Sequence, residues 1–302
     1  MEATHDEGRV RVTGDARQQL YDASGYGEPL GGDSVALSPV EAAYLLSEGK
    51  VDAVDGDGYA DFVARAVDNT AALRAYSDLR DRGYYLDHDS ELLLYERGDH
   101  PANSSPKTRV EAVDEYADVR VDALPSLLAV ADDDGDVTYF SVETVEPAGD
   151  FPEPGGVVSA EHRGGGYVAR DADGLLGPRY GAETDDGSLA LSPVEAAYLH
   201  ERGVVEAPDG DPDGGRLAVY ADLRDRRTCP RTGFKFGSDF RVYETTEDDH
   251  ASLLVSVVET DATVPVTELS RFVRLAHGVR KRAVYALVGD GVGYVAVERE
   301  RP

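Results

Sequence analysis

The sequence predicts a mixed α/β (α+β) protein that consists of two homologous modules in tandem. The segment LSPVEAAYL occurs at 37–45 and again, unchanged, at 191–199. SDLRDR from Ser77 is repeated as ADLRDR from Ala221, and DVTYFSV around Tyr139 is repeated as GVGYVAV around Tyr294. In each copy, helical patterns come first and strand patterns follow. Each module is therefore expected to hold an N-terminal helix and strand subdomain, followed by a mixed sheet with flanking helices.

The first predicted element of each copy is a helix with a capping box. Ser38 and Ser192 are suited to be N-caps, proline follows each serine, and Glu41 and Glu195 stand three residues after the caps. A serine cap and a glutamate at this spacing satisfy each other's free backbone N–H groups. We interpret these residues as structural and not catalytic.

The remaining elements follow in the same order in both copies, and they are clearest in the second. After a short polar turn, a second helix runs through DLRDR. FKFGSDFRVY (234–243) alternates like a strand, and SLLVSVVE (252–259) and RAVYALV (282–288) are apolar runs typical of buried strands. Between these runs, apolar residues at helical spacing predict a helix over 267–280. If that helix continues, Arg274 and Lys281 project toward a common side.

The copies are separated by EPAGDFPEPGG (146–156), whose proline and glycine content is typical of a linker. The predicted organisation is a first repeat over 1–146, a linker over 147–156 and a second repeat over 157–302.

The 302-residue chain is 41% hydrophobic, which is enough for real cores, yet its formal net charge is −29. Two interpretations compete: the chain repels polyanions, or it belongs to a very salty cytoplasm. We favour the second, because about 1 M salt screens charges within roughly 3 Å. Only four lysines occur, at Lys50, Lys107, Lys235 and Lys281.

Other features of the composition indicate the cellular compartment. The single cysteine, Cys229, excludes an internal disulfide, and no apolar run approaches the roughly 20 residues that span a bilayer. The first residues, MEATHDEGRV, lack the form of a secretory signal. We expect a cytoplasmic protein.

One stretch contradicts the acidic character of the chain. RFVRLAHGVRKRAVY, from Arg271, holds five cations and a histidine, with no carboxylate between Arg271 and Arg282. This stretch predicts a negatively charged partner.

Four blocks of the second copy occur in a distinctive order: VYADLRDR, TGFKFGSDFRVY, HASLLVSVV and VRLAHGVRKRAVYALV. They resemble the catalytic domain of the archaeal tRNA-splicing endonuclease, or tRNA-intron endonuclease, over a core of about 217–297. The duplicated chain resembles the type in which two repeats are fused and the polypeptide pairs with itself, and its composition fits a haloarchaeal member. The resemblance implies a nuclease-like mixed sheet in each copy, a degenerate first repeat that is structural, and a catalytic second repeat.

The resemblance also implies a catalytic triad of Tyr243, His250 and Lys281. The sequence departs from the family pattern at Leu253 or Leu254, where an aromatic is frequent, and at Gly278, where serine is usual. Only six residues, ETTEDD, separate Tyr243 from His250. None of these departures touches the triad.

These three residue types suit metal-free RNA cleavage. The 2′-hydroxyl attacks the adjacent phosphorus, which requires a base, an acid for the leaving 5′-oxygen and a cation for the phosphorane. Tyrosine, with an ordinary pKa of about 10, is a base only where positive charge favours its anion, and the Arg280–Arg282 cluster is the expected source. Histidine donates a proton near neutrality, and Lys281 stabilises the phosphorane. The expected products are 2′,3′-cyclic phosphate and 5′-hydroxyl ends, with no metal and no cofactor.

The family recognises a bulge-helix-bulge fold in precursor tRNA, with two arginines that sandwich a bulge base. Arg274 matches the first, Arg299 is our choice for the second with Arg301 as the alternative, and Arg280 is a further RNA contact. The acidic segment ADDDGDV holds Asp132, Asp133, Asp134 and Asp136. In the family, a loop at this place docks into a basic pocket of the other subunit, which predicts a homodimer. An acidic turn and a weak metal site are the alternatives.

The first copy lacks the triad. Tyr95 ends LLLYERGDH, but the positions of His250 and Lys281 fall near Ala102 and Ser126, with His100 close to the first. DGDPDG from Asp209 begins like a calcium loop, yet Pro212 interrupts it and Tyr220 stands where glutamate is required, so no calcium site is predicted. Two other functions remain open: a non-catalytic RNA-binding subunit and a metal-dependent endonuclease.

Overall fold

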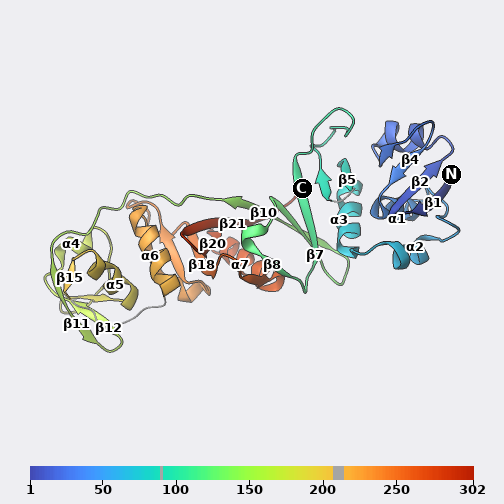
Figure 1. The fold of residues 1–302 in the computed structure, drawn as a ribbon. Coiled ribbons are helices and arrows are strands. Elements are labelled where there is room, and N and C mark those ends of the chain that lie inside the picture. The colour runs from blue at the N-terminus through green and yellow to red at the C-terminus, as the bar shows by residue number, and fades with distance from the viewer. Residues whose placement is uncertain (89–90, 207–213) are drawn as a thin grey trace.

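The computed structural model describes residues 1–88, 91–206 and 214–302. Figure 1 shows an elongated molecule, with the N-terminal subdomains of the two copies at opposite ends and a shared sheet between them. Within the described residues, no helix has the length and apolarity required to cross a bilayer. The calcium-like segment from Asp209 lies outside the described ranges.

The N-terminal subdomain of the first copy packs helices on a four-stranded antiparallel sheet of order β1-β2-β4-β3. Its elements are β1 (Glu2–Asp6), β2 (Arg9–Thr13), the π-helix η1 (Arg17–Asp22), β3 (Glu28–Pro29), β4 (Val35–Leu37), α1 (Pro39–Ser47) and α2 (Tyr59–Ala66). The predicted capping box is present, since Ser38 Oγ accepts from Glu41 N–H and the Glu41 carboxylate accepts from Ser38 N–H. Helix α2 was not predicted, because a short turn was expected between the capped helix and DLRDR.

The second copy opens with a corresponding subdomain, whose sheet has the order β13-β14-β12-β11-β15. Its elements are β11 (Val158–Arg163), β12 (Gly166–Ala169), α4 (Asp173–Leu176), β13 (Ala182–Glu183), β14 (Leu189–Leu191), α5 (Pro193–Glu201) and β15 (Val205–Glu206). The same capping box links Ser192 and Glu195.

The nuclease-like parts of the two copies follow one element order. In the first copy they are α3 (Thr70–Asp81), β5 (Leu86–His88), β6 (Leu92–Leu94), β7 (Thr108–Asp114), β8 (Asp118–Arg120), the 3₁₀ turn η2 (Val121–Ala123), β9 (Leu127–Ala131) and β10 (Val137–Thr144). In the second they are α6 (Gly214–Asp225), β16 (Cys229–Thr232), the 3₁₀ turn η3 (Phe234–Phe236), β17 (Phe240–Tyr243), β18 (Leu253–Glu259), β19 (Thr263–Pro265), α7 (Val266–Gly278), β20 (Arg282–Val288) and β21 (Val292–Glu300). The main difference is that α7 replaces the single turn η2.

The two nuclease-like parts share one ten-stranded sheet of order β16-β17-β18-β20-β21-β10-β9-β7-β6-β5. The join is an antiparallel pairing of β10 with β21, from Tyr139 with Glu300 to Thr144 with Val295. Because each strand is the last of its own copy, the pairing removes two exposed sheet edges at once. β8 and β19 also pair with each other across the join. The predicted mixed α/β class is confirmed.

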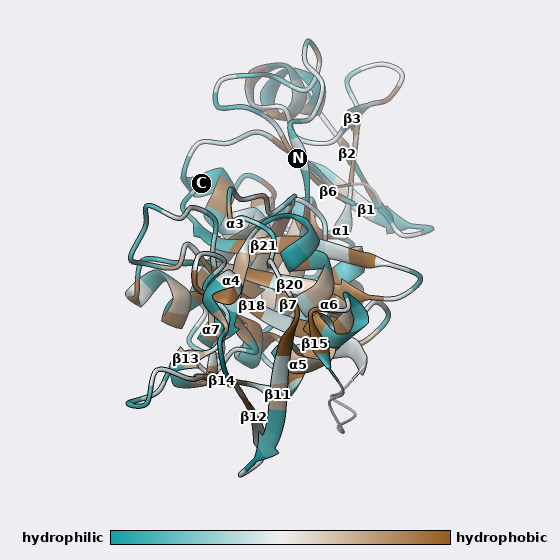
Figure 2. Cartoon of the chain, turned by 90° about the vertical axis from the view of Figure 1, so that its left-hand side faces the viewer, coloured by the Kyte–Doolittle hydropathy of each residue, from teal (hydrophilic) through white to brown (hydrophobic). Residues whose placement is uncertain are grey.

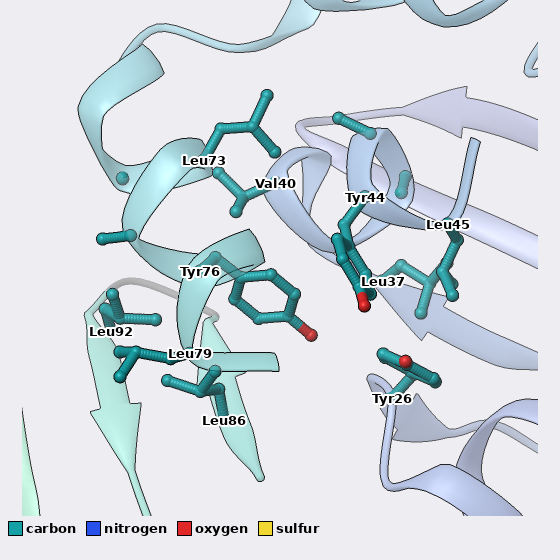
Figure 3. Packing of buried hydrophobic residues seen from close by; sticks show 14 of the residues in the cluster. Tyr26, Leu37, Val40, Tyr44, Leu45, Leu73, Tyr76, Leu79, Leu86 and Leu92 are labelled. Atoms are coloured by element: carbon teal, nitrogen blue, oxygen red, sulfur yellow. The ribbon is translucent and has the colours of Figure 1, made fainter. Parts of the chain in front are cut away.

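The cores repeat between the copies. Tyr76 of α3 is fully buried, and Figure 3 shows its ring directed from α3 toward Tyr44 of α1, with Leu79 on the side of the strands. Tyr44 Oη donates to Asp81, as Tyr198 Oη does to Asp225 in the second copy. Burial of a leucine such as Leu79 contributes about 1.5–3 kcal/mol to the stability of the fold. Figure 2 shows hydrophobic residues on the central strands and hydrophilic residues on the outer loops.

Residues 147–156 form no helix or strand, but they are packed against the second copy. Phe151 is buried, and the backbone of Gly149 lies so close to Arg227 O and Glu244 O that a Cβ would stand 2.3 and 2.6 Å from these oxygens. The predicted linker is therefore fixed against the second copy, and not loosely tethered.

Candidate active site

The sheet topology brings the three predicted catalytic residues to one edge. Tyr243 is the last residue of β17, and β18 starts beside that end because the two strands are antiparallel, with Val242 opposite Leu253. β20 runs parallel to β18 and places Arg282 opposite Leu253. Lys281 and the loop that carries His250 therefore meet at the starts of two neighbouring parallel strands.

Lys281 is tied to the end of the His250 loop. Its Nζ donates to Ala251 O at 2.9 Å, and the next residue, Arg282, donates its backbone N–H to Ser252 O at 2.9 Å. Lys281 is half-buried, with Nζ 5.8 Å from the centre of the Phe236 ring. Because an ammonium carries three N–H donors and one is used by a described residue, two remain for a ligand within the described part of the chain.

The turn before Lys281 differs from the sequence prediction. Helix α7 ends at Gly278, and Arg280 adopts the left-handed conformation with φ 57°. Lys281 N–H donates to Ala276 O at 2.9 Å and Arg280 N–H to His277 O at 3.0 Å, which is a Schellman motif. The helix does not continue to Lys281, so Arg274 and Lys281 do not share a helical face.

His250 lies in an exposed acidic loop between β17 and β18. The loop base is closed by Ser252, whose N–H donates to Val242 O at 3.0 Å and whose Oγ donates to the Glu244 carboxylate at 2.5 Å. The His250 imidazole makes no hydrogen bond to any residue that the structure describes. It is therefore free to meet a ligand.

Tyr243 is half-buried, and its backbone pairs with Cys229 of β16. The guanidinium carbons of Arg179 and Arg241 lie 5.8 and 5.9 Å from its ring centre. The sequence prediction assigned the positive charge near this ring to the Arg280–Arg282 cluster and missed Arg179. Arg282 is instead neutralised by ion pairs to Glu143 and Glu298.

Two of the predicted RNA-binding arginines gather beside the lysine. Arg280 and Arg299 line, together with Lys281 and His277, a pocket of about 690 Å³. Arg274 is exposed on α7 but does not line this pocket, and neither does Arg301. Within the described part of the chain, Arg274, Arg280, Lys281 and Arg299 have no carboxylate within ion-pair distance.

The acidic segment forms the hairpin between β9 and β10. Asp132 closes it by accepting from Asp136 N–H at 2.9 Å, and Asp133 accepts from Tyr116 Oη at 2.7 Å. That hydrogen bond raises the pKa of Tyr116 to about 12. Asp134 and Asp136 project into solvent without a cationic partner among the described residues.

The strand register locates the corresponding positions of the first copy. Leu94 lies opposite Thr108 as Val242 lies opposite Leu253, so the counterpart of Tyr243 is Tyr95, which is buried. Counting back from the next strand places the counterpart of His250 at Ser105, three residues beyond the predicted Ala102. The same register places the counterpart of Lys281 at Leu124, two residues before the predicted Ser126, because Tyr294 lies opposite Ala286 as Tyr139 lies opposite Ala129.

His100 cannot substitute for His250 in the first copy. Its two ring nitrogens contact Tyr21 O and Ala102 N–H, and its ring packs on Tyr21 and Tyr85. The first copy thus has a tyrosine at the right place, without the imidazole or the ammonium.

Two family models and several relatives match the chain. The model of the tRNA intron endonuclease catalytic C-terminal domain matches residues 215–295, and that of the tRNA intron endonuclease N-terminal domain matches 1–64 and 167–214. The chain is 40% identical to a tRNA-splicing endonuclease of Haloferax volcanii and 40% identical to one of Natronomonas pharaonis, with full coverage of both chains in each case. A Methanosarcina mazei tRNA-splicing endonuclease is 33% identical, with 96% of each chain covered. The chain therefore belongs to the tRNA-splicing endonuclease family, the RNA endonucleases of tRNA intron excision.

Proposed function

We propose that the chain cleaves precursor tRNA at bulge-helix-bulge junctions without a metal ion, through Tyr243, His250 and Lys281. The observation that carries the proposal is the bond from Lys281 Nζ to Ala251 O, next to His250 and beside the end of the strand that carries Tyr243. The second repeat, 157–302, is the cutting unit and the first, 1–146, its support. The reaction takes place in the cytoplasm, where an archaeal cell holds its precursor tRNA.

The reaction is an internal phosphoryl transfer. Tyr243, as its phenolate, takes the proton of the 2′-hydroxyl, and the 2′-oxygen forms a bond to the adjacent phosphorus. The bond from phosphorus to the 5′-oxygen then breaks, and the imidazolium of His250 gives its proton to that oxygen. One RNA end is left as a 2′,3′-cyclic phosphate and the other as a 5′-hydroxyl. The guanidinium carbons of Arg179 and Arg241, 5.8 and 5.9 Å from the centre of the Tyr243 ring, place two cations beside the base.

Lys281 stabilises the phosphorane. Its bond to Ala251 O holds the ammonium in place before the substrate arrives, and two donors stay available for the charged oxygens. A fixed cation directed at charge that develops in the transition state costs no reorganisation during the reaction.

RNA contacts and assembly complete the proposal. Arg280 and Arg299 bind the RNA around the pocket at Lys281, while Arg274 and Arg299 stack on a bulge base, with Arg301 as the alternative to Arg299. The carboxylates of the β9–β10 hairpin dock into a basic pocket on the second repeat of another copy, so that a homodimer presents two active sites to two bulges. Asp134 and Asp136, which are exposed and have no cationic partner among the described residues, support the docking.

Cleavage of a bulge-helix-bulge RNA in high salt with EDTA tests the proposal. The intact protein is compared with His250→Ala and Lys281→Ala, and the product ends are identified. Cutting that survives EDTA, leaves cyclic phosphate and collapses in both variants is the expected result. Loss of cutting in EDTA would indicate a metal-dependent endonuclease, and binding without cutting would indicate an RNA-binding subunit.

A further inference from the structure

The His250 loop is fixed by groups that lie outside the nuclease-like part of the second copy. Arg179, in the N-terminal subdomain between α4 and β13, donates from Nη2 to Thr246 O at 2.7 Å and from Nη1 to Asp248 O at 3.0 Å. The same guanidinium lies 5.8 Å from the ring centre of Tyr243. One side chain therefore contacts both the loop of the acid and the ring of the base.

The linker residue Asp150 fixes the other side of this loop. Its carboxylate accepts from Thr246 N–H at 2.8 Å and from Thr245 Oγ at 3.2 Å, and its own N–H donates to Glu244 O at 3.1 Å. The loop sequence ETTEDD carries four carboxylates, which repel one another and oppose a compact loop. Arg179 and Asp150 bind its backbone and so oppose this repulsion.

The internal repeat supplies a comparison for Arg179. Tyr26 and Gly27 of the first copy correspond to Tyr180 and Gly181 of the second, and both glycines donate their N–H to the glutamate of the capping box. The residue before the tyrosine is therefore Gly25 in the first copy and Arg179 in the second. Both adopt the left-handed region, with φ 62° at Gly25 and 57° at Arg179. Glycine takes this conformation without strain, whereas an arginine there is strained.

The copy without the triad thus has the unstrained residue, and the copy with the triad has a strained arginine. In the first copy, a Cβ at Gly25 would meet Tyr85 at 2.9 Å, because that ring fills the space. We infer that Arg179, assisted by Asp150, is a positioning residue for RNA cleavage: it holds the His250 loop and the Tyr243 ring in register across the subdomain boundary. This inference rests on the proposed role of His250.

The test is the Arg179→Gly variant, which removes the guanidinium and restores the residue type of the first copy, so that folding is preserved. We expect the single-turnover cleavage rate at saturating protein to fall about 10- to 100-fold, because a displacement of about 1 Å in a catalytic group has an effect of that order. The dissociation constant of the RNA should change less than about threefold, and the unfolding temperature should change little, because relief of the left-handed strain offsets the loss of two hydrogen bonds. Arg179→Lys, which retains one donor, should recover part of the rate. Asp171→Gly, at an exposed left-handed residue of the same subdomain, is the matched control and should cut normally.

A double-mutant cycle with His250→Ala separates positioning from a general structural role. If Arg179 acts through the loop of His250, Arg179→Gly should cost much less in the His250→Ala background than in the intact protein. An equal loss in both backgrounds, or an unchanged rate in the single variant, would overturn the inference. If His250→Ala alone cuts at the normal rate, the proposed function fails instead, which keeps the two failures distinguishable.

Discussion

Lys281 Nζ lies 2.9 Å from the carbonyl oxygen of Ala251, the residue that directly follows His250. Ala251 is buried, so this carbonyl depends on the lysine for its hydrogen bond. One contact thereby fixes the proposed phosphorane cation and ties down the end of the loop that carries the proposed acid.

Replacement of Lys281 by alanine should therefore lower both activity and stability. The single-turnover cleavage rate should fall about 10²- to 10³-fold, the range seen when a group that stabilises transition-state charge is removed. Leaving the Ala251 carbonyl unpaired should cost about 1–3 kcal/mol in the free energy of unfolding, measured by denaturant titration.

The matched control is Lys107→Ala, which removes an exposed lysine paired with Glu96 in the first copy. That variant should cut at the normal rate and lose at most about 1 kcal/mol. A Lys281→Ala protein that still cuts at the normal rate would refute the role of this ammonium.

The elements of the second copy were predictable because local signals agree with the fold. The capping boxes, the apolar strands and the blocks around Tyr243 and Lys281 depend on residues close in sequence, and the structure has the expected helices and strands there. Helix α2 was not predicted, because the connection after α1 was treated as a polar turn, although Phe62 is buried and Val63 and Ala66 pack against the same core.

The positions of Arg179 and Asp150 were beyond sequence reasoning. Arg179 is 64 residues before Tyr243, and its contacts depend on how two subdomains pack. The one local signal was the replacement of Gly25 by arginine at a place where the chain turns with positive φ, and the sequence does not display φ. The end of α7 was missed for a similar reason, since Arg280 occupies a left-handed position that usually indicates glycine.

Glu41 should make stability depend on pH. Burial raises the pKa of this carboxyl from 4.5 to about 7, although it accepts hydrogen bonds from Ser38 and Gly27. Between pH 4.5 and 7 the folded state holds a proton that the unfolded state has lost, so stability falls as pH rises through this window and is level above it. The total fall is about 3 kcal/mol.

The check is the unfolding temperature of Glu41→Gln and of the intact protein from pH 4 to 8. The variant cannot ionise, so the difference between the two proteins should change across this window. In its counterpart Glu195, the carboxylate oxygen Oε1 lies 3.5 Å from Nη1 of Arg231. Glu41 has no such ion pair among the described residues, so Glu195→Gln is the natural comparison. Parallel curves for Glu41→Gln and the intact protein would contradict the assignment.

Arg280→Gly should separate backbone strain from RNA binding. Arg280 is left-handed and exposed, and glycine at this place of a Schellman motif avoids a cost of about 1 kcal/mol. The variant should unfold at an equal or higher temperature, yet bind bulge-helix-bulge RNA more weakly, because a cation of the pocket is lost. Arg280→Lys should keep most of the affinity with no gain in stability. Unchanged RNA affinity in Arg280→Gly, measured at constant salt, would exclude Arg280 from the RNA contacts.

The acidic hairpin gives the clearest test of assembly. Asp134 and Asp136 are exposed and have no cationic partner within the described residues, while Asp132 and Asp133 are used inside the hairpin. Asp134→Asn with Asp136→Asn should therefore keep the hairpin folded but weaken its proposed docking into a basic pocket of the second copy. Sedimentation in high salt should show the intact protein as a dimer and the variant shifted toward monomer. Asp290→Asn, in the corresponding β20–β21 hairpin of the second copy, is the matched control and should remain dimeric. If the double variant stays dimeric at the lowest measurable concentrations, these carboxylates do not hold the subunits together.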